Sequence, residues 1–540
     1  MLFNSYEFLL VFLPATLLGF FLLGSQSRSL ALAWLVVTSL AFYAWWRPIN
    51  VLIIAPSIAV NFILARTLLR LRGDKPRAGR ARLVLALGIV FNVAFLGYFK
   101  YVNFLSTASN DLFGTHFVLT QIVLPLGISF ITFQKIAFLI DVHGGRVDSF
   151  TLRDYGLFVL FFPQLIAGPI VHYREMMPQF KEASCRVQAN HLALGLTLLA
   201  FGLFKKVVLA DGIAEYVSPI YETAAAGKPV SFIAAWIAAI GFTLQIYFDF
   251  AGYSDMAIGI ARCFGLKLPA NFDSPLKATS IIDFWLRWHM TLTRFLTAYL
   301  YNPLVLWLTR RRLARGKPGF GGRAPSVGAF LQLLVGPTLL TMLVSGVWHG
   351  AGYLFIAWGL LHGVYLAVNH AWRVFGPRAR IDRDRYARWM GPLGLVLTFL
   401  AVAFAMVLFR SPTAAAAGDI VQAMTGQHGI GVPPQLQGLL GRLVSPAAVP
   451  IEWSTQELAL RLAWVAVLLA IALLLPNTLQ LTARFEPALS LRAAPVEGAA
   501  WLRRVLNWAP SLPWAFTVSA LMVAAIMRLG GKSEFLYWQF

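Results

Sequence analysis

Two histidines stand in a stretch of the chain that is otherwise almost entirely apolar. His349 and His362 lie in "SGVWHGAGYLFIAWGLLHGVYL", residues 345–366. Ionisable groups at membrane depth are costly and usually mark a functional or partnered position. Gly350 and Gly352 would let the backbone bend beside His349 and let a substrate approach closely. His362 is 13 positions further on, about 20 Å along an ideal helix. We therefore expect His349 to do chemistry and His362 to be a hydrogen-bonded packing residue.

A second stretch combines a histidine with charged residues. It reads "SIIDFWLRWHMTLTRFLTAYLYNPL", residues 280–304. Its apolar positions recur at helical spacing, which predicts a helix that lies in the membrane interface or dips into it. Offsets of 4 and 7 would place Asp283, Arg287 and Arg294 on one face, with His289 pointing elsewhere.

A third stretch, "QIYFDFAGYSDMAIG", contains Asp249 and Asp255. Gly252 would permit a bend between them. Two interpretations remain open here. The carboxylates either support a reaction, or they are held at a helix break by backbone N–H groups or arginines.

A buried imidazole without an acidic triad or a thiolate suits general base catalysis, because its pKa lies near neutrality. It would take a proton from a hydroxyl, whose oxygen then attacks an acyl thioester. The sequence contains two cysteines, Cys185 and Cys263, and no H-E-x-x-H motif. We therefore expect neither a metal site nor a bound cofactor.

The composition predicts the membrane environment that these groups share. The 540 residues are 58% hydrophobic and 13% charged, whereas soluble domains are about a quarter charged. The net charge of +22 sits in short loops between apolar runs, which is the positive-inside bias and not a nucleic-acid surface. The first run lacks a basic n-region, so we expect it to remain as a span.

Repeated apolar runs predict an all-α polytopic membrane protein with about 11–13 transmembrane or re-entrant helices, arranged as a single domain over 1–540. The run at 122–140 contains Pro125, Gln134 and Lys135 and is a candidate for re-entry. The expected runs are 8–24, 30–46, 51–69, 83–99, 122–140, 155–171, 192–210, 231–250, 327–348, 353–369, 391–409, 457–475 and 513–528.

Loop charges predict the orientation of the chain. Basic loops on the cytoplasmic side leave both termini outside. The segment 411–456 would then be a periplasmic loop, and 529–540 a periplasmic tail.

The motifs together resemble the membrane-bound O-acyltransferase family, MBOAT. The resemblance is to the bacterial branch of alginate O-acetyltransferases and teichoic acid D-alanine exporters. It rests on "FWLRWHMTLTRFL" and "SGVWHGAGYLFIAWGLLHG", and on four further stretches. These are "MLFNSYEFLLVFLP", "LPLGISFITFQKIAFLID", "FFPQLIAGPIVHYREMMPQF" and "QIYFDFAGYSDMAIGIARCFGLKLPANFDSP". It spans most of the chain outside 411–510.

The resemblance implies a ring of helices around a central funnel, with a catalytic core at about 120–370. It implies that His349 is the catalytic histidine and His289 the second histidine of the site. Asp283, Arg287, Trp348, Asp249 and Asp255 are expected to support them. We expect His349 to be the general base and His289 to donate a hydrogen bond to the developing oxyanion.

The implied function is O-acetylation of an exported polysaccharide such as alginate by a multi-pass protein of the bacterial inner membrane. Acetyl-CoA or another acyl thioester is the expected cytoplasmic donor, and an SGNH-type periplasmic transferase or esterase the expected partner. Alginate-type members usually read "RDYLYIPLGG" where this chain has "TAYLYNPLVLWLTRRR". The acceptor therefore stays open between alginate, peptidoglycan, cellulose and a small molecule. A transporter or export channel is the alternative from another class, but it would have no need of the His349 imidazole.

Two further sets of residues are candidates. The basic loop residues Arg310, Arg311, Arg312 and Arg315 would recruit a polyanionic donor such as coenzyme A, or else only set topology and contact lipid head groups. The C-terminal "FLYWQF" resembles a Phe-x-Tyr-x-x-Phe motif of related export systems, in which Tyr537 would carry the acyl group. Its alternative is an aromatic anchor at the membrane interface.

Overall fold

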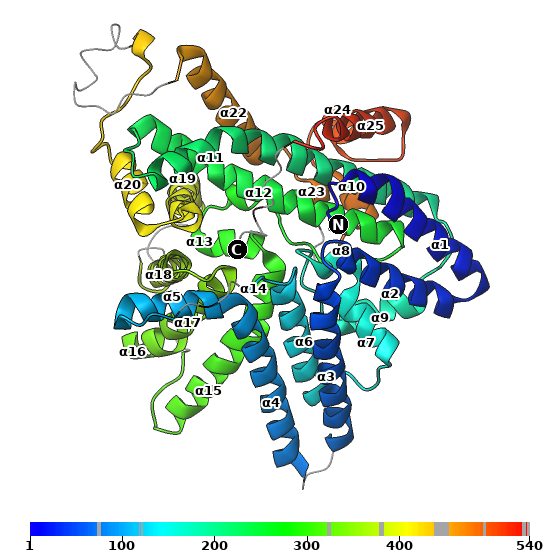
Figure 1. The fold of residues 1–540 in the computed structure, drawn as a ribbon. Coiled ribbons are helices and arrows are strands. Elements are labelled where there is room, and N and C mark those ends of the chain that lie inside the picture. The colour runs from blue at the N-terminus through cyan, green and yellow to red at the C-terminus, as the bar shows by residue number, and fades with distance from the viewer. Residues whose placement is uncertain are drawn as a thin grey trace. The chain divides into compact units, whose positions relative to one another are not determined.

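A computed structural model of the chain describes residues 1–72, 77–117, 119, 122–320, 326–376, 383–436, 453–489, 493–531 and 536. The described residues fold mainly into helices, which Figure 1 colours from blue to red along the chain. In the described residues the β-structure is limited to one isolated bridge between Pro269 and Leu489. This confirms the predicted all-α class.

The chain divides into two compact units. The first comprises Met1–Phe204, Gly252–Ala270 and Thr478–Gly531, and the second comprises Lys205–Ala251, Asn271–Asn477 and Lys532–Phe540. The helix α12, Phe232–Cys263, contributes to both.

The first unit is built from helices of the N-terminal third and the C-terminal end of the chain. Among them, α3, α4 and α6 lie side by side (Figure 1). The elements are η1 Glu7–Phe12, α1 Leu13–Gln26, α2 Arg28–Ala44, α3 Ile49–Leu71, α4 Ala78–Leu96, η3 Gly97–Tyr101, α5 Val102–Phe113, α6 Ile128–His143, α7 Leu152–Leu160, α8 Phe162–Leu165, α9 Tyr173–Glu182, α10 Ala189–Phe204, α23 Thr478–Leu481, η9 Ala483–Phe485, α24 Ala500–Leu506 and α25 Leu512–Ile526.

The second unit contains the histidine stretches. Its elements are η4 Lys205–Ala210, α11 Asp211–Ala225, η5 Pro275–Lys277, α13 Ile281–Arg287, α14 Met290–Leu296, η6 Thr297–Tyr301, α15 Asn302–Leu313, α16 Val327–Phe330, η7 Leu331–Val335, α17 Gly336–His349, α18 Tyr353–Phe375, α19 Arg383–Arg410, α20 Ala414–Met424 and α22 Thr455–Leu474.

Within the described ranges, nine helical stretches are long and apolar enough to cross a membrane. They are Glu7–Gln26, Ile49–Leu71, Ala78–Phe113, Ala189–Ala225, Phe232–Cys263, Val327–His349, Tyr353–Phe375, Arg388–Arg410 and Thr455–Leu474. Arg28–Ala44 and Leu512–Ile526 are shorter apolar helices. The prediction of a polytopic membrane protein is therefore confirmed.

Three of the expected helical features differ from the structure. The run at 155–171 is not one helix, because α7 ends at Leu160, α8 has four residues and the chain after it is irregular. The expected bend at Gly252 is absent, and α12 runs on through it to Cys263. Gly252 instead allows close packing, since a Cβ added to Gly202 of α10 would lie 2.5 Å from the Gly252 carbonyl oxygen.

The third correction concerns residues 280–304. The predicted single helix is interrupted after Arg287, and a new helix begins at Met290. Asp283 and Arg287 remain a pair at i and i+4 on α13, whereas Arg294 belongs to α14. The periodicity was correct within each half, but the left-handed backbone conformation at His289 separates the two helices.

Glycines set the packing of α17 against α18. A Cβ added to Gly359 would lie 2.4 Å from the carbonyl oxygen of Met342, and one added to Gly346 would lie 2.3 Å from that of Phe355. Small residues of this kind let two membrane helices approach backbone to backbone. These glycine contacts hold α17, which ends at His349, against α18, which begins at Tyr353.

We expect Gly359→Ala to lower the melting temperature of the detergent-purified protein, because overpacking a tight contact costs about 1–3 kcal/mol. Gly391→Ala is the matched control. Gly391 also lies inside a helix, α19, and a Cβ there meets no atom within 4 Å. An equal loss in both variants would contradict the close contact of α17 with α18.

Candidate active site

His289 occupies the break between two short helices, α13 and α14. It has φ 42° and ψ 52°, in the left-handed region that non-glycine residues rarely adopt. The main chain on either side is held by the loop before η5. Met290 N donates to Asn271 O at 2.9 Å, and Asp273 N donates to Arg287 O at 3.0 Å. The surrounding structure thus maintains the unusual backbone of His289.

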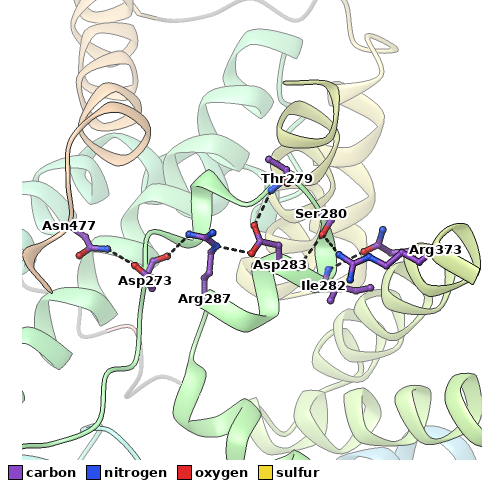
Figure 2. A network of polar contacts seen from close by, with 9 residues as sticks. Asp273, Thr279, Ser280, Ile282, Asp283, Arg287, Arg373 and Asn477 are labelled. Atoms are coloured by element: carbon purple, nitrogen blue, oxygen red, sulfur yellow. Dashed lines mark hydrogen bonds and ion pairs between the residues drawn. The ribbon is translucent and has the colours of Figure 1, made fainter. Parts of the chain in front are cut away.

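A polar network braces α13 from the side of that loop, as Figure 2 shows. Arg287 Nε donates to Asp283 Oδ1 at 2.9 Å, and Arg287 Nη1 contacts Asp273 O at 3.4 Å. Asn477 Nδ2 donates to Asp273 Oδ1 at 2.8 Å. Asp283 and Arg287 therefore hold the segment that leads to His289.

The same network ties α13 to α18. Arg373 Nη2 donates to Ser280 Oγ at 3.2 Å, and Ile282 N donates to Asn369 Oδ1 at 3.2 Å (Figure 2). Ser280 also caps α13 by accepting from Asp283 N. The helix before His289 is thereby fixed to the helix that follows His349.

His349 is the last residue of α17, and the backbone continues in an extended conformation at Gly350 and Gly352. Neither glycine has a positive φ, so a glycine matters here because it is small and not because of its backbone freedom. A Cβ at Gly350 would lie 2.1 Å from the ring of Phe355. The chain can therefore turn between α17 and α18 while Phe355 packs against it.

The two histidines expected at the site line one small cavity. The cavity is lined by Ile246, Phe250, Trp288, His289, His349, Trp358, Met406 and Phe409. The ring centres of His289 and His349 are 6.4 Å apart. His289 is 0% exposed and His349 is 6% exposed. The two imidazoles therefore face the same apolar space, His289 from the break between α13 and α14 and His349 from the end of α17.

Aromatic rings fix the orientation of both imidazoles. Phe250 packs edge-on against His289 at 4.7 Å between ring centres, and Trp358 packs against His349 at 5.0 Å. Trp348 contacts both, at 6.0 Å from His289 and 4.8 Å from His349. His289 lies outside the candidate membrane spans, and burial lowers its pKa, which keeps its imidazole neutral. A neutral imidazole is the form that can accept a proton.

His362 does not line this cavity. Trp285 Nε1 donates to His362 Nδ1 at 3.3 Å, and the His362 ring packs on Trp358 at 4.8 Å. This agrees with the predicted hydrogen-bonded packing role.

The carboxylates of the third stretch contact other residues. Asp249 pairs with Lys206 at 2.8 Å, and Lys206 also pairs with Asp211 at 2.6 Å. Asp255, in the first unit, accepts from Thr478 Oγ1 at 2.8 Å. Neither aspartate is among the described residues that line the cavity. Asp249 is thus held by a lysine at membrane depth.

The basic residues near the end of α15 fall into two groups. Arg312 is 8% exposed and donates to Pro318 O, Gln332 Oε1 and Ser326 Oγ at 2.6, 2.9 and 3.3 Å. Arg310, Arg311 and Arg315 are exposed, and Arg311 lies over the ring of Trp307 at 5.3 Å. Arg312 therefore fixes the loop, and the other three are accessible to an anion. Tyr537 lies outside the described residues.

Several residues at or next to the cavity were not singled out from the sequence. Asn271, which contacts the His289 segment, stands in the family-like stretch "LPANFDSP", but nothing in its type marked it. Trp358, Met406 and Phe409 look like ordinary apolar residues of a span. Their role depends on which side of the helix faces the cavity, which periodicity alone does not reveal.

Comparison with known proteins identifies the class. The sequence model of the membrane-bound O-acyltransferase family, MBOAT, matches residues 146–315. The chain is 39% identical to the peptidoglycan O-acetyltransferase of Helicobacter pylori, over 80% of this chain and 81% of that protein. It is 36% identical to the probable alginate O-acetylase AlgI of Pseudomonas aeruginosa, over 78% of this chain and 75% of that protein.

A more distant similarity extends to the teichoic acid D-alanyltransferase of Bacillus subtilis, which is 28% identical over 53% of this chain and 68% of that protein. The chain belongs to the membrane-bound O-acyltransferase family. It is an acyltransferase and a multi-pass bacterial membrane protein.

Lys206 offers a test of the buried charges around α12. It is 1% exposed and bonds two aspartates, so Lys206→Ala would leave buried carboxylates without their cation. Breaking a buried pair in this way costs about 3–5 kcal/mol. We expect folded protein in the membrane fraction to fall sharply, as measured by fluorescence-detected size exclusion. Lys228→Ala, at an exposed lysine, should leave it unchanged. Normal folding of Lys206→Ala would contradict a structural role for the pair.

Proposed function

We propose that the protein is an inner-membrane O-acetyltransferase that moves acetyl groups from a cytoplasmic thioester, such as acetyl-CoA, for O-acetylation of an exported polysaccharide. The observation that carries the proposal is the pair of buried imidazoles, His289 and His349, on one cavity. The family supports acyl transfer, and the names of the relatives supply polymer acceptors.

The reaction needs two polar contacts, one to the attacking hydroxyl and one to the carbonyl oxygen of the thioester. One imidazole takes the proton from the attacking hydroxyl while the new C–O bond forms. The other donates a hydrogen bond to the thioester carbonyl oxygen as negative charge develops on it. The C–S bond then breaks, and the proton passes to the leaving thiolate. The apolar lining of Phe250, Trp358 and Phe409 keeps water from the thioester.

The acceptor polymer has two candidates. The relative from H. pylori carries the name peptidoglycan O-acetyltransferase and is 39% identical, and the alginate relatives follow at up to 36%. The departure from the alginate-type pattern at 297–312 weighs against alginate. We place peptidoglycan first. Mass spectrometry of muropeptides and of exported polysaccharide, from cells with and without the gene, would decide between them.

Delivery to the polymer is part of the proposal. Tyr537 would receive the acyl group as an ester and hand it to an SGNH-type periplasmic partner. Tyr537→Phe keeps the aromatic ring and removes the hydroxyl, so it separates an acyl carrier from a membrane anchor.

We expect His349→Ala to insert and fold normally and to lower the acetylation rate by about 10²–10⁴-fold, the usual contribution of a proton-transfer group. The assay is transfer from radiolabelled acetyl-CoA in proteoliposomes, with size exclusion as the check of folding. A normal rate in this variant would remove His349 from the site.

Neutralising Arg310, Arg311 and Arg315 together should raise the apparent KM for acetyl-CoA with little change in kcat, because these guanidinium groups are exposed and available to phosphates. Arg312→Gln is the matched comparison. It should mainly lower the melting temperature, since Arg312 bonds the loop itself. An unchanged KM in the triple variant with correct insertion would leave these residues as determinants of topology.

A further inference from the structure

We infer that His362 is a positioning residue for the imidazole of His349, and that it acts through Trp358, which packs against both rings. This inference rests on the proposed acyl transfer, in which His349 takes the proton from the attacking hydroxyl. His362 is not among the described residues that line the cavity, so it can affect the reaction only through another side chain.

The ring of Trp358 contacts both imidazoles. Its centre lies 5.0 Å from that of His349, at an interplanar angle of 85°, and 4.8 Å from that of His362, at 62°. Trp358 is 1% exposed, so its ring can turn only if a neighbour moves. Trp358 and His362 lie at i and i+4 on α18, a spacing that places two side chains on one face of a helix. The His362 ring therefore limits the orientations that Trp358 can adopt.

A hydrogen bond from Trp285 fixes the His362 ring. Trp285 Nε1 donates to His362 Nδ1 at 3.3 Å, and an indole N–H can only donate. Nδ1 therefore carries no hydrogen, and the single N–H of this neutral imidazole is at Nε2. A half-turn of the ring would break the bond and leave the indole N–H buried without its acceptor, which is costly.

The helix α13 holds His362 with two neighbouring side chains. Phe284 stacks on the imidazole, with ring centres 6.4 Å apart and an interplanar angle of 14°, and Trp285 meets the imidazole at 5.3 Å and 87°. The ion pair of Asp283 with Arg287 braces the same helix. A continuous series of side-chain contacts thus runs from α13 through His362 to Trp358.

The next contact in this series is His349, whose place in the chain gives its ring little support from the backbone. It is the last residue of α17, and the chain continues in an extended conformation at Gly350. Its ring packs against those of Trp358 and Phe409, at 5.0 and 5.4 Å. A general base must lie within hydrogen-bond reach of the proton that it takes, and a misplacement of about 1 Å can cost about 10²-fold in rate. A His349 ring that turns away from the hydroxyl would lose rate without losing the fold.

Histidine combines two properties that position 362 needs, a flat ring and a hydrogen-bond acceptor. Leucine would fill much of the space but would leave the indole N–H of Trp285 without its acceptor. Asparagine carries its side-chain oxygen on Cγ, where the imidazole carries Nδ1, so it keeps the acceptor with a smaller side chain. The two substitutions therefore separate the hydrogen bond from the packing.

The test compares kcat and the donor KM of folded protein, isolated by size exclusion, for His362→Leu, His362→Asn and Trp285→Phe. We expect His362→Leu to lower kcat about 10²-fold with little change in KM, because the base is misoriented while the donor still binds. His362→Asn should recover about tenfold of that loss, since it keeps the acceptor. Trp285→Phe should lower kcat as His362→Leu does, and the double variant should be no worse than either single variant.

His370→Leu is the matched control. His370 is half-buried and lies on the same helix as His362. Its replacement should leave kcat unchanged. If His362→Leu folds and keeps its kcat, or if His362→Asn recovers none of the loss, the inference is overturned. An acidic limb of the kcat/KM profile that moves in His362→Leu would also overturn it, because that limb reports the base itself and a positioning residue leaves it in place.

A measurement without turnover separates this inference from the proposed function. In protein with ¹⁵N-labelled histidine, the His362 resonances should show a hydrogen on Nε2 and none on Nδ1. Trp285→Phe should shift the His349 resonances as well as those of His362. The opposite tautomer, or His349 resonances that Trp285→Phe leaves unmoved, would overturn the inference even where a His362 variant fails to fold. A wild type that transfers no acetyl would instead refute the proposed function, and the spectra would still decide whether His362 positions His349.

Discussion

The left-handed backbone conformation of His289 is the constraint on which the site depends. A non-glycine residue in the left-handed region is strained and persists only where its surroundings impose it. Here Asn271 and Asp273 bond the main chain on both sides, and the Asp283–Arg287 pair braces the preceding helix. With this break, the stretch forms two short helices, α13 and α14, and His289 lines the cavity with His349.

A lipid environment favours partners within the protein for buried polar groups. In a bilayer, a polar group that lacks a partner within the protein costs several kcal/mol. The second unit meets this constraint with internal pairs, such as Lys206 between Asp211 and Asp249, and Trp285 against His362. Aromatic rings, Trp348 and Trp358 among them, hold the imidazoles and exclude water.

The sequence predicted the helical class, the membrane environment and the two histidines, because apolar runs and polar groups at membrane depth are local properties. It failed where tertiary contacts override local pattern. Gly252 suggested a bend, but α12 continues through it and packs closely against α10 there. The break at His289 has no glycine or proline to announce it. Asn271 is 18 positions away from its partner and has an ordinary residue type, so only the fold reveals its role. The funnel and the roles of the site residues remain predictions.

The most direct test of the account is a cryo-EM structure of the protein with a non-hydrolysable thioether analogue of acetyl-CoA. We expect the acyl-equivalent carbon to lie in the cavity between His289 and His349, with Trp358 and Phe250 against it. An ordered analogue whose acyl end lies away from both imidazoles would contradict acyl transfer at this site.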